Sequence, residues 1–341
     1  MMEQLREIEA TGLTVVAAVA AVSAAIGTVF ARRLAHAIGM VSHPNPIVPQ
    51  HTRSIAYLGG AGVAFGIVVA IMFMWWRSRF NGANFDIGLL PVILGCSAAF
   101  LLLGVMDDRR AFGAASKFTL QAIIAGVAVS LGVRVPMFGI LPIDWFASWL
   151  WICILVNAFN FVDVSDGLLT SVAAIVFIAI AVAFPHTAPL AVPAAAACLG
   201  FLPFNRPPAS IFLGDAGSHL LGFIAAALTI IGARDCPSPV AGWLVSAAIL
   251  VVPLFELVFI TIVRIRKGIP WWKGSPDHFA LRLQAAGFDR PAVNAIAAGV
   301  TVTAAIAAVV ALRISLIATI IAMALVCCGM IPCWRYLIRM K

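Results

Sequence analysis

The sequence FLGDAGS, residues 212–218, places a single carboxylate between two long apolar segments, 188–204 and 217–232. Apolar segments of about 20 residues are long enough to cross a bilayer as helices, so Asp215 is expected at the edge of a membrane span. The neighbouring Gly214 leaves room for other groups to approach the carboxylate oxygens. The stretch has two interpretations: a seat for a hard cation and a phosphate group, or a turn in which the aspartate caps the next helix.

The composition around this stretch is that of a membrane protein. Of the 341 residues, 63% are hydrophobic and 11% are charged, with a mean hydropathy of +1.07. A soluble domain is nearer half apolar and a quarter charged. The net charge of +8 fits basic cytoplasmic loops, so no nucleic acid partner is expected. The seven cysteines show no spacing typical of zinc sites.

The predicted fold is all-α, a polytopic helical bundle formed by residues 1–341 as one integral-membrane domain. We expect eleven transmembrane helices. They are residues 13–30, 55–76, 88–106, 117–134, 145–162, 168–184, 188–204, 217–232, 240–263, 291–311 and 314–334.

The distribution of basic residues predicts the orientation of the bundle. With the N-terminus outside and eleven spans, 16 of the 22 lysines and arginines face the cytoplasm, as the positive-inside rule requires. An even number of spans would place the basic end of the chain, residues 335–341, outside. We therefore expect a cytoplasmic C-terminus.

Five aspartates then gather at the cytoplasmic ends of spans, in the loops that follow spans three, five and seven. They are Asp107, Asp108, Asp163, Asp166 and Asp215. Crowded carboxylates repel one another unless a cation compensates them. Their convergence predicts a divalent-metal site that opens to the cytoplasm.

The stretch NAFNFVDVSDGL, residues 157–168, has a polar side chain at every third position. Asn157, Asn160, Asp163 and Asp166 drift by about 60° per step on an α-helix. Either the helix tightens locally to three residues per turn, or it ends near Asp163. Four such groups are costly inside an apolar span, which favours a functional role.

Two further stretches carry charge on the same face. Lys117 begins the span after the Asp107-Asp108 pair, an arrangement that suits metal or phosphate binding or an ordinary charged turn. The hydrophilic stretch KGIPWWKGSPDHFALRL, residues 267–283, contains His278 and Arg282. Alone, His278 would be an ordinary surface histidine, but beside Lys273 and Arg282 it is a candidate donor to phosphate oxygens. Its tryptophans fit either an interfacial aromatic belt or a contact with substrate or lipid.

Taken together, these stretches resemble a known family, the polyprenyl-phosphate N-acetylhexosamine-1-phosphate transferases of glycosyltransferase family 4. The stretches NRPPASIFLGDAGS (205–218) and SPDH (275–278) resemble the GlcNAc-type branch, which includes the undecaprenyl-phosphate GlcNAc-1-phosphate transferases. The resemblance rests on five stretches in the family's order: HTRSIAYLGG (51–60), Asp107-Asp108 with Lys117, NAFNFVDVSDG (157–167), FNRPPASIFLGDAGS (204–218) and SPDHFALRL (275–283).

This resemblance implies a reaction. A sugar-1-phosphate, from an N-acetylhexosamine, passes from a UDP-sugar to polyprenyl (undecaprenyl) phosphate. The products are polyprenyl-diphospho-sugar and UMP, and the step initiates synthesis of a cell-envelope glycan, such as lipopolysaccharide or the cell wall. The implied cofactor is Mg²⁺, with Mn²⁺ as an alternative. The implied location is the bacterial inner membrane, with several crossings; a homodimer is left open.

The resemblance also assigns roles by matched position. Asp107 resembles the proposed base or lipid-phosphate partner, supported by Asp108, and Asp215 and Asn160 resemble the metal ligands. Phe212 corresponds to the aromatic that stacks on uracil. The implied substrate-binding residues are Lys117, Asn157, Asp163, Asp166, Asn205, Phe212, Gly214, His278 and Arg282.

Two departures from the family pattern concern the sugar more than the reaction. Val164 stands where the family commonly has glycine, and the family's histidine-rich loop is reduced to His278. Three alternatives stay open: a phospho-MurNAc-pentapeptide transferase, a secondary transporter, and a sugar-nucleotide-binding scaffold without catalysis. A transporter would depend on Glu256, which lies deep in a span just after Pro253, and would tolerate loss of Asp215. For Glu256 itself we expect a structural role.

Overall fold

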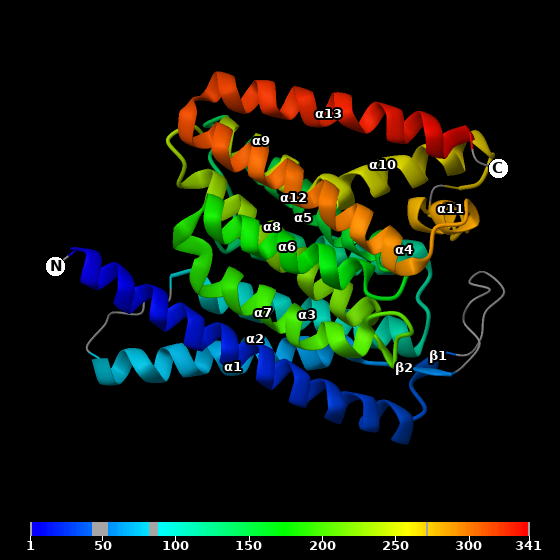
Figure 1. The fold of residues 1–341 in the computed structure, drawn as a ribbon, viewed down its shortest axis with the longest axis horizontal. Coiled ribbons are helices and arrows are strands. Elements are labelled where there is room, and N and C mark those ends of the chain that lie inside the picture. Colours follow the sequence, from blue (N-terminus) through cyan, green and yellow to red (C-terminus); the bar gives the residue numbers. More distant parts are fainter. Residues whose placement is uncertain (1, 43–53, 82–87, 271, 340–341) are drawn as a thin grey trace.

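The computed structural model describes residues 2–42, 54–81, 88–270 and 272–339 (Figure 1). Most of the described chain is helical, which confirms the all-α class. The α-helices are α1 (Met2–Ala37), α2 (Gly59–Asn81), α3 (Leu90–Arg109), α4 (Ala114–Ser130), α5 (Leu141–Val162), α6 (Leu168–Ala183), α7 (Ala188–Asn205), α8 (Gly214–Arg234), α9 (Pro239–Ile249), α10 (Val251–Arg266), α11 (Phe279–Ala285), α12 (Arg290–Ile314) and α13 (Leu316–Arg339). A short 3₁₀ turn, Pro185–Thr187, precedes α7.

Eight helices in the described ranges are long and apolar enough to cross a membrane. A ninth crossing results if α9 and α10, which meet at an angle of 72°, form one broken span. The apolar helices α4 and α6 are shorter, with 17 and 16 residues. Each of the eleven predicted segments thus contains a helix, but length and composition support eight or nine crossings. The count of eleven stays a prediction.

The structure corrects two of the predicted segments. The segment 55–76 does not begin as a helix, because Ile55–Tyr57 forms strand β2 and α2 starts only at Gly59. The segment 240–263 is not one helix, because α9 ends at Ile249 and α10 begins at Val251.

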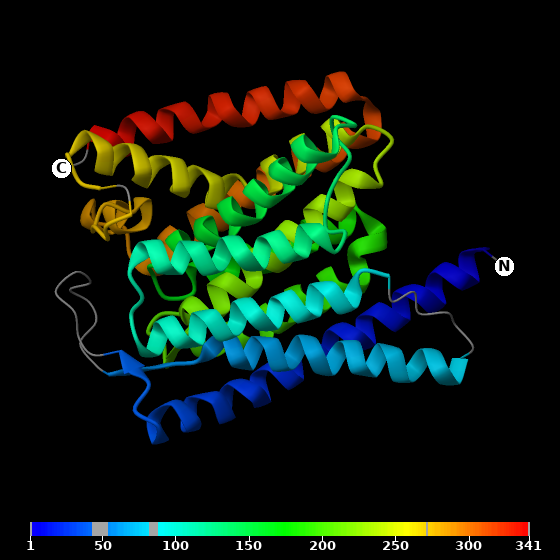
Figure 2. The ribbon, with the colours of Figure 1, turned by 180° about the vertical axis from the view of Figure 1, so that it is seen from behind.

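A small three-stranded sheet lies at one end of the bundle and was not predicted. Strand β1 (Val41–Ser42) pairs antiparallel with β2, and β2 pairs parallel with β3 (Ile211–Phe212). The register places Tyr57 opposite Phe212. The sheet therefore joins the segment before α2 to the start of the FLGDAGS stretch. In both ribbon views it lies at the same end of the molecule as α11 (Figure 1 and Figure 2).

Helix α8 is the centre of the bundle. Of its membrane-spanning stretch, 94% of the residues are buried, against 11% for α13. It packs against α3, α5, α2 and α9, whereas α13 lies at one outer edge and α1 and α2 at the opposite side (Figure 1). A helix that is apolar on all sides belongs in a protein interior, and the many glycines and alanines of α8 allow its neighbours to approach closely.

The first turn of α8 is held by direct backbone contact with two other helices. A Cβ atom added at Gly60 of α2 would lie 2.3 Å from the backbone nitrogen of Gly217. One added at Gly104 of α3 would lie 2.3 Å from the nitrogen of Ala216. Side chains cannot be accommodated at either position, so these contacts fix the start of α8, where Asp215 lies.

Candidate active site

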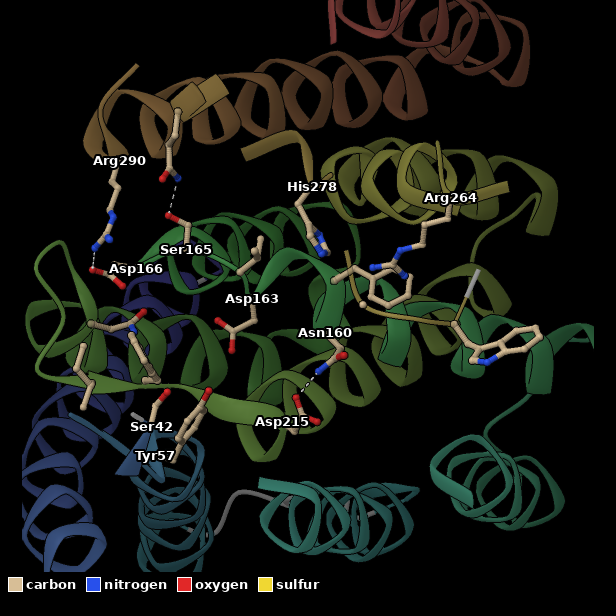
Figure 3. Close-up of a pocket in the computed structure, with 18 residues that line it drawn as sticks. Ser42, Tyr57, Asn160, Asp163, Ser165, Asp166, Asp215, Arg264, His278 and Arg290 are labelled. Carbon is tan, nitrogen blue, oxygen red and sulfur yellow. Dashed lines mark hydrogen bonds and ion pairs between the residues drawn. The ribbon is translucent and has the colours of Figure 1, made fainter. Parts of the chain in front are cut away.

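A cavity of about 430 Å³ opens at the end of the bundle that carries the small sheet and α11. Figure 3 shows its walls. Asn160, Asp163 and Asp166 come from the end of α5 and the turn that follows it, and Asp215 comes from α8. Tyr57 and Phe212 come from the sheet; Arg264 and His278 come from α10 and the residue before α11. The cavity therefore joins segments that are far apart in the sequence.

The end of α5 decides between the two conformations predicted for residues 157–166, a helix that tightens to three residues per turn or a helix that ends near Asp163. The helix ends at Val162 and Asp163 is its C-terminal cap, so the second alternative is correct. The turn passes through Gly167 with φ of 73°, a conformation that glycine adopts readily. As a result Asp163 and Asp166 leave the helix and line the cavity. Burial raises the pKa of Asp163 well above its usual value, and the carboxylates of Asp215 and Asp108 raise it further.

Lys117 joins the first and third acidic stretches. Its Nζ lies 2.8 Å from Oδ2 of Asp107 and also forms an ion pair with Asp215. On the other side of Asp215, Nδ2 of Asn160 donates to Oδ1 at 2.6 Å. The predicted metal ligands Asp215 and Asn160 are therefore in direct contact.

Asp108, which lies on α3, caps the N-terminus of α8. Its carboxylate accepts the backbone N–H groups of Asp215 at 2.9 Å and Ala216 at 3.1 Å. These are among the N–H groups that a helix leaves without a partner in its own first turn. Gly214, at φ of 75°, is packed so closely that an added Cβ would lie 2.6 Å from Oδ2 of Asp108. The turn before Asp215 is thus specific for glycine.

The oxygen donors around Asp215 fit a Mg²⁺ or Mn²⁺ ion. Carboxylate and amide oxygens are the ligands that these hard cations prefer. A rotation of the Asn160 amide by 180° exchanges Nδ2 and Oδ1, so that its oxygen lies next to the Asp215 carboxylate. Within the described ranges no group of three or more His, Cys, Asp or Glu residues is arranged to hold a metal ion. Mg²⁺ is usually held by one or two carboxylates, with water and substrate phosphates completing the shell, and a pair of protein ligands agrees with that pattern.

The opposite wall of the cavity carries positive charge. Arg264 is buried, its guanidinium lies 5.2 Å from the ring centroid of Phe161, and its Nε donates to Oγ of Ser275 at 3.2 Å. His278 has its Nδ1 at 2.6 Å from Oε1 of Glu256. The cavity thus has an acidic wall, where a cation can sit, and a basic wall, where anionic oxygens can sit.

The aromatic wall is formed by the sheet. The rings of Tyr57 and Phe212 meet edge to face, with centroids 5.5 Å apart and an interplanar angle of 63°. Burial, together with the nearby carboxylates of Asp108, Asp163 and Asp215, raises the pKa of Tyr57 to about 12. Its phenol therefore stays neutral, and the two rings offer an uncharged surface to a ligand.

Comparison with known proteins identifies the family. Residues 90–233 match the model of glycosyl transferase family 4. Decaprenyl-phosphate N-acetylglucosaminephosphotransferase of Mycobacterium tuberculosis is 31% identical over 318 residues, which cover 82% of this chain and 76% of that protein. The chain belongs to glycosyl transferase family 4.

Other relatives extend the same likeness. The probable undecaprenyl-phosphate N-acetylglucosaminyl 1-phosphate transferase of Bacillus subtilis is 28% identical, over 77% of this chain and 74% of that protein. The undecaprenyl-phosphate alpha-N-acetylglucosaminyl 1-phosphate transferase of Escherichia coli K12 is 27% identical, over 76% and 73%. The resemblance to polyprenyl-phosphate sugar-1-phosphate transferases is confirmed.

In this glycosyl transferase family 4 member, several predicted site residues have structural partners. Asn157 does not line the cavity; it donates to Oε1 of Gln121 at 2.9 Å and to the carbonyl of Cys153 at 2.8 Å. Arg282 is buried and donates to Asp277 and to the carbonyl of Leu337. Their predicted contacts with substrate stay predictions.

Asn205 and Asp166 line the cavity but also hold its walls. Oδ1 of Asn205 accepts from the backbone of Gly167 and the hydroxyl of Thr170. Oδ2 of Asp166 pairs with Arg290 at the start of α12 and accepts the backbone N–H of Ala209 at 3.1 Å. Both residues thus shape the turn after α5.

Sequence reasoning missed the cavity-lining roles of Tyr57, Arg264 and Arg290. In the sequence, Arg264 is one of the basic residues on the predicted cytoplasmic side, and Tyr57 lies in the predicted span 55–76 and in the matched stretch HTRSIAYLGG. Residues 51–53 of the first matched stretch, and Trp271, lie outside the described residues.

Proposed function

We propose that the protein transfers N-acetylhexosamine-1-phosphate from a UDP-sugar to polyprenyl phosphate and releases UMP. Membership of a family whose curated members carry this activity in their names supports the proposal. The observation that carries it is the cavity itself. It combines an aromatic wall, an acidic wall whose oxygens suit a cation, and a basic wall within one space of about 430 Å³, as a nucleoside diphosphate sugar requires.

The walls suggest how the donor lies. Phe212, braced by Tyr57, offers a ring face on which uracil stacks. Asp215 and Asn160 would hold Mg²⁺. When bound, the ion would neutralise the negative charge that develops on the phosphate groups during transfer. Arg264 and His278 then face the remaining diphosphate oxygens, since charged donors bind phosphate oxygens strongly.

The transfer is a displacement at phosphorus. A phosphate monoester has a second pKa near 6, so the lipid phosphate is largely dianionic at neutral pH. One of its oxygens attacks the phosphorus that carries the sugar, the bond to the UMP oxygen breaks, and UMP leaves with the electron pair. Positioning and charge neutralisation are what such a step chiefly needs. Lys117 and Asp107 stand beside Asp215. There the Lys117 ammonium group would hold the phosphate oxygens, and the Asp107 carboxylate would orient the lipid phosphate or accept any remaining proton.

The membrane arrangement that fits this function has eleven crossings. Eight long helices, the bent pair α9 and α10, and the shorter α4 and α6 would together supply them. The cavity receives the C-terminal ends of α5 and α10 and the N-terminal ends of α8 and α12, as alternating crossings require. With the N-terminus outside, that end of the bundle would face the cytoplasm, where UDP-sugars are found, and the proposed location is the bacterial inner membrane. A homodimer stays a prediction.

The test uses the purified full chain. It is incubated with Mg²⁺ or Mn²⁺, undecaprenyl or decaprenyl phosphate, and each of UDP-GlcNAc, UDP-GalNAc and UDP-MurNAc-pentapeptide. We expect UMP release with an N-acetylhexosamine donor, dependent on lipid and metal, and a diphospho-sugar lipid by mass spectrometry. A preference for the MurNAc-pentapeptide donor would replace the proposal by its closest alternative. No UMP release with any donor and lipid would contradict it.

A further inference from the structure

Glu256 is a buried residue of α10, and both of its carboxylate oxygens contact the start of α11. It has no solvent exposure. Oε1 lies 2.6 Å from Nδ1 of His278, and Oε2 accepts the backbone N–H of Phe279 at 3.2 Å. Burying a carboxylate is costly unless it is hydrogen-bonded and paired. Glu256 meets this requirement by binding two consecutive residues at the start of α11.

His278 is the member of this contact that reaches the cavity. Its side chain is 12% exposed, it lines the cavity, and its ring is directed inward from above Asp163 and Asn160 (Figure 3). The ring of Phe161 packs against it edge to face, with centroids 6.3 Å apart. Because Nδ1 is bound to Glu256, Nε2 is the nitrogen left for a ligand, and the bond made by one ring nitrogen sets the state of the other.

A cap for α11 would need only the contact with the Phe279 backbone. The shorter of the two contacts instead goes to a side chain that reaches the cavity. Among the described residues, the guanidinium of Arg264 lies near the Glu256 carboxylate, and Asp277, which precedes His278, pairs with Lys267 and Arg282. The Glu256 carboxylate therefore contacts the His278 ring and lies near the Arg264 guanidinium, and both of these groups line the cavity.

We propose that Glu256 is a positioning residue for the transfer reaction. It holds the imidazole of His278 so that Nδ1 carries a proton and Nε2 faces the donor's diphosphate, and its charge stabilises the protonated ring when that ring binds the phosphate oxygens. The proposed function supplies the identity of the ligand, the diphosphate of a UDP-sugar. The contact between Glu256 and His278 does not depend on it. It gives Glu256 a role that differs from the structural one expected from the sequence and from proton transport.

A double-mutant cycle tests the proposal by kinetics. The four proteins are the wild type, Glu256→Gln, His278→Ala and the double variant, assayed for kcat and KM of the UDP-sugar. We expect Glu256→Gln to lower kcat about 10- to 100-fold, as losses of supporting hydrogen-bond partners do at metal sites. The double variant should then match His278→Ala alone, because residues that act through one another are not additive. If Glu256→Gln costs the same factor in the His278→Ala background, Glu256 does not act through His278 and the proposal is overturned.

A matched control comes from the same helix. Thr261 lies five residues after Glu256, and its hydroxyl donates only to the carbonyl of Leu257 in its own helix at 2.7 Å. Thr261→Val removes a polar group from α10 without touching α11, so kcat should stay within about twofold of the wild type. A loss equal to that of Glu256→Gln would show that α10 is sensitive to any polar deletion, and would overturn the specific role.

A spectroscopic test is independent of turnover. With ¹⁵N-labelled histidine in detergent-solubilised protein, the resonances lost in His278→Gln assign the His278 ring. We expect a protonated Nδ1 in the wild type and a shift of both ring nitrogens in Glu256→Gln. An unchanged His278 spectrum in Glu256→Gln overturns the proposal. A protein that releases no UMP but shows the shift would contradict the proposed function and retain the positioning.

Discussion

Lys117 on α4 forms an ion pair with Asp215 on α8, although the two residues are 98 positions apart in the sequence. The same ammonium group lies 2.8 Å from Asp107 on α3. One lysine thus links three helices at the point where the acidic stretches meet. Its single positive charge can compensate only one of the two carboxylates, and the remaining negative charge favours a cation next to Asp215.

Asp215→Asn should reduce kcat about 100-fold or more, the usual scale for removing a group that stabilises transition-state charge. UMP release at saturating Mg²⁺ measures the effect, and the melting temperature reports on folding. Asp235 provides the control: it caps the opposite end of the same 21-residue helix, about 30 Å away, and pairs with Arg234. Asp235→Asn should keep its activity. An active Asp215→Asn enzyme would refute the assignment of Asp215 as a metal ligand.

Phe212→Ala should raise KM for the UDP-sugar. Stacking of a base on an aromatic ring contributes about 1–3 kcal/mol in nucleic-acid sites, so we expect a rise of roughly 5- to 150-fold, with a smaller change in kcat. Phe212→Tyr keeps the ring and should keep KM. If Phe212→Ala leaves KM unchanged, the ring serves only to pack against Tyr57.

The reaction should proceed by direct displacement, without a phosphoryl-enzyme. A carboxylate can act as a covalent nucleophile, but both candidates here are engaged as acceptors. Asp107 binds the backbone of Phe112 at 2.6 Å and the ammonium group of Lys117, and Asp108 binds two N–H groups of α8. Labelled UMP should therefore not exchange into UDP-sugar unless polyprenyl phosphate or its diphospho-sugar product is present. Exchange in lipid-free enzyme that disappears in Asp107→Asn would favour a covalent intermediate.

The loop before α11 should be stabilised by Asp277 in a pH-dependent way. Burial opposes ionisation of Asp277, but ion pairs with Lys267 and Arg282 outweigh it and hold the pKa of this carboxyl below its usual value. The contribution to stability is therefore present above the unfolded value of about 3.9 and is lost as the pH falls through the lower folded value. Asp277→Asn should cost about 1.5–3 kcal/mol at neutral pH, seen as a lower melting temperature. The difference from the wild type should narrow below about pH 4. A difference that does not depend on pH would contradict this account.

Much of the bundle could be predicted because membrane helices follow from length and apolar composition alone. All eleven predicted segments contain helices, and the end of α5 at Val162 was one of two outcomes allowed by the spacing of its polar residues. The small sheet could not be predicted, because Ile55–Tyr57 is apolar and runs into the following span without a break in hydropathy. The bend at Leu250 does have a signal, because Pro253 has no backbone N–H to donate to the carbonyl of Ile249, the helical bond that would join α9 to α10.

The composition of the site was predictable only in part, and its contacts were not predictable. Spacing indicates which residues can reach one face, and it brought Asn160, Asp163 and Asp215 together correctly at one cavity. It does not say what each side chain binds. The partners of Asn157 and Arg282 come from α4 and α13, and such pairings depend on how distant helices pack.

The glycines around the cavity differ in whether they can be replaced by larger residues. Those that pack against the start of α8, beside the acidic wall, cannot be replaced, whereas one on the opposite loop can. At Gly60 and Gly104 any side chain would displace the backbone next to Asp215. Gly274, on the loop opposite, also lines the cavity, but a Cβ there meets nothing within 4 Å. Substitutions at Gly274 can therefore fill the donor space without moving the acidic wall. If the cavity holds the donor as proposed, a larger residue at position 274 should change which UDP-sugars the enzyme accepts and leave the acidic wall in place.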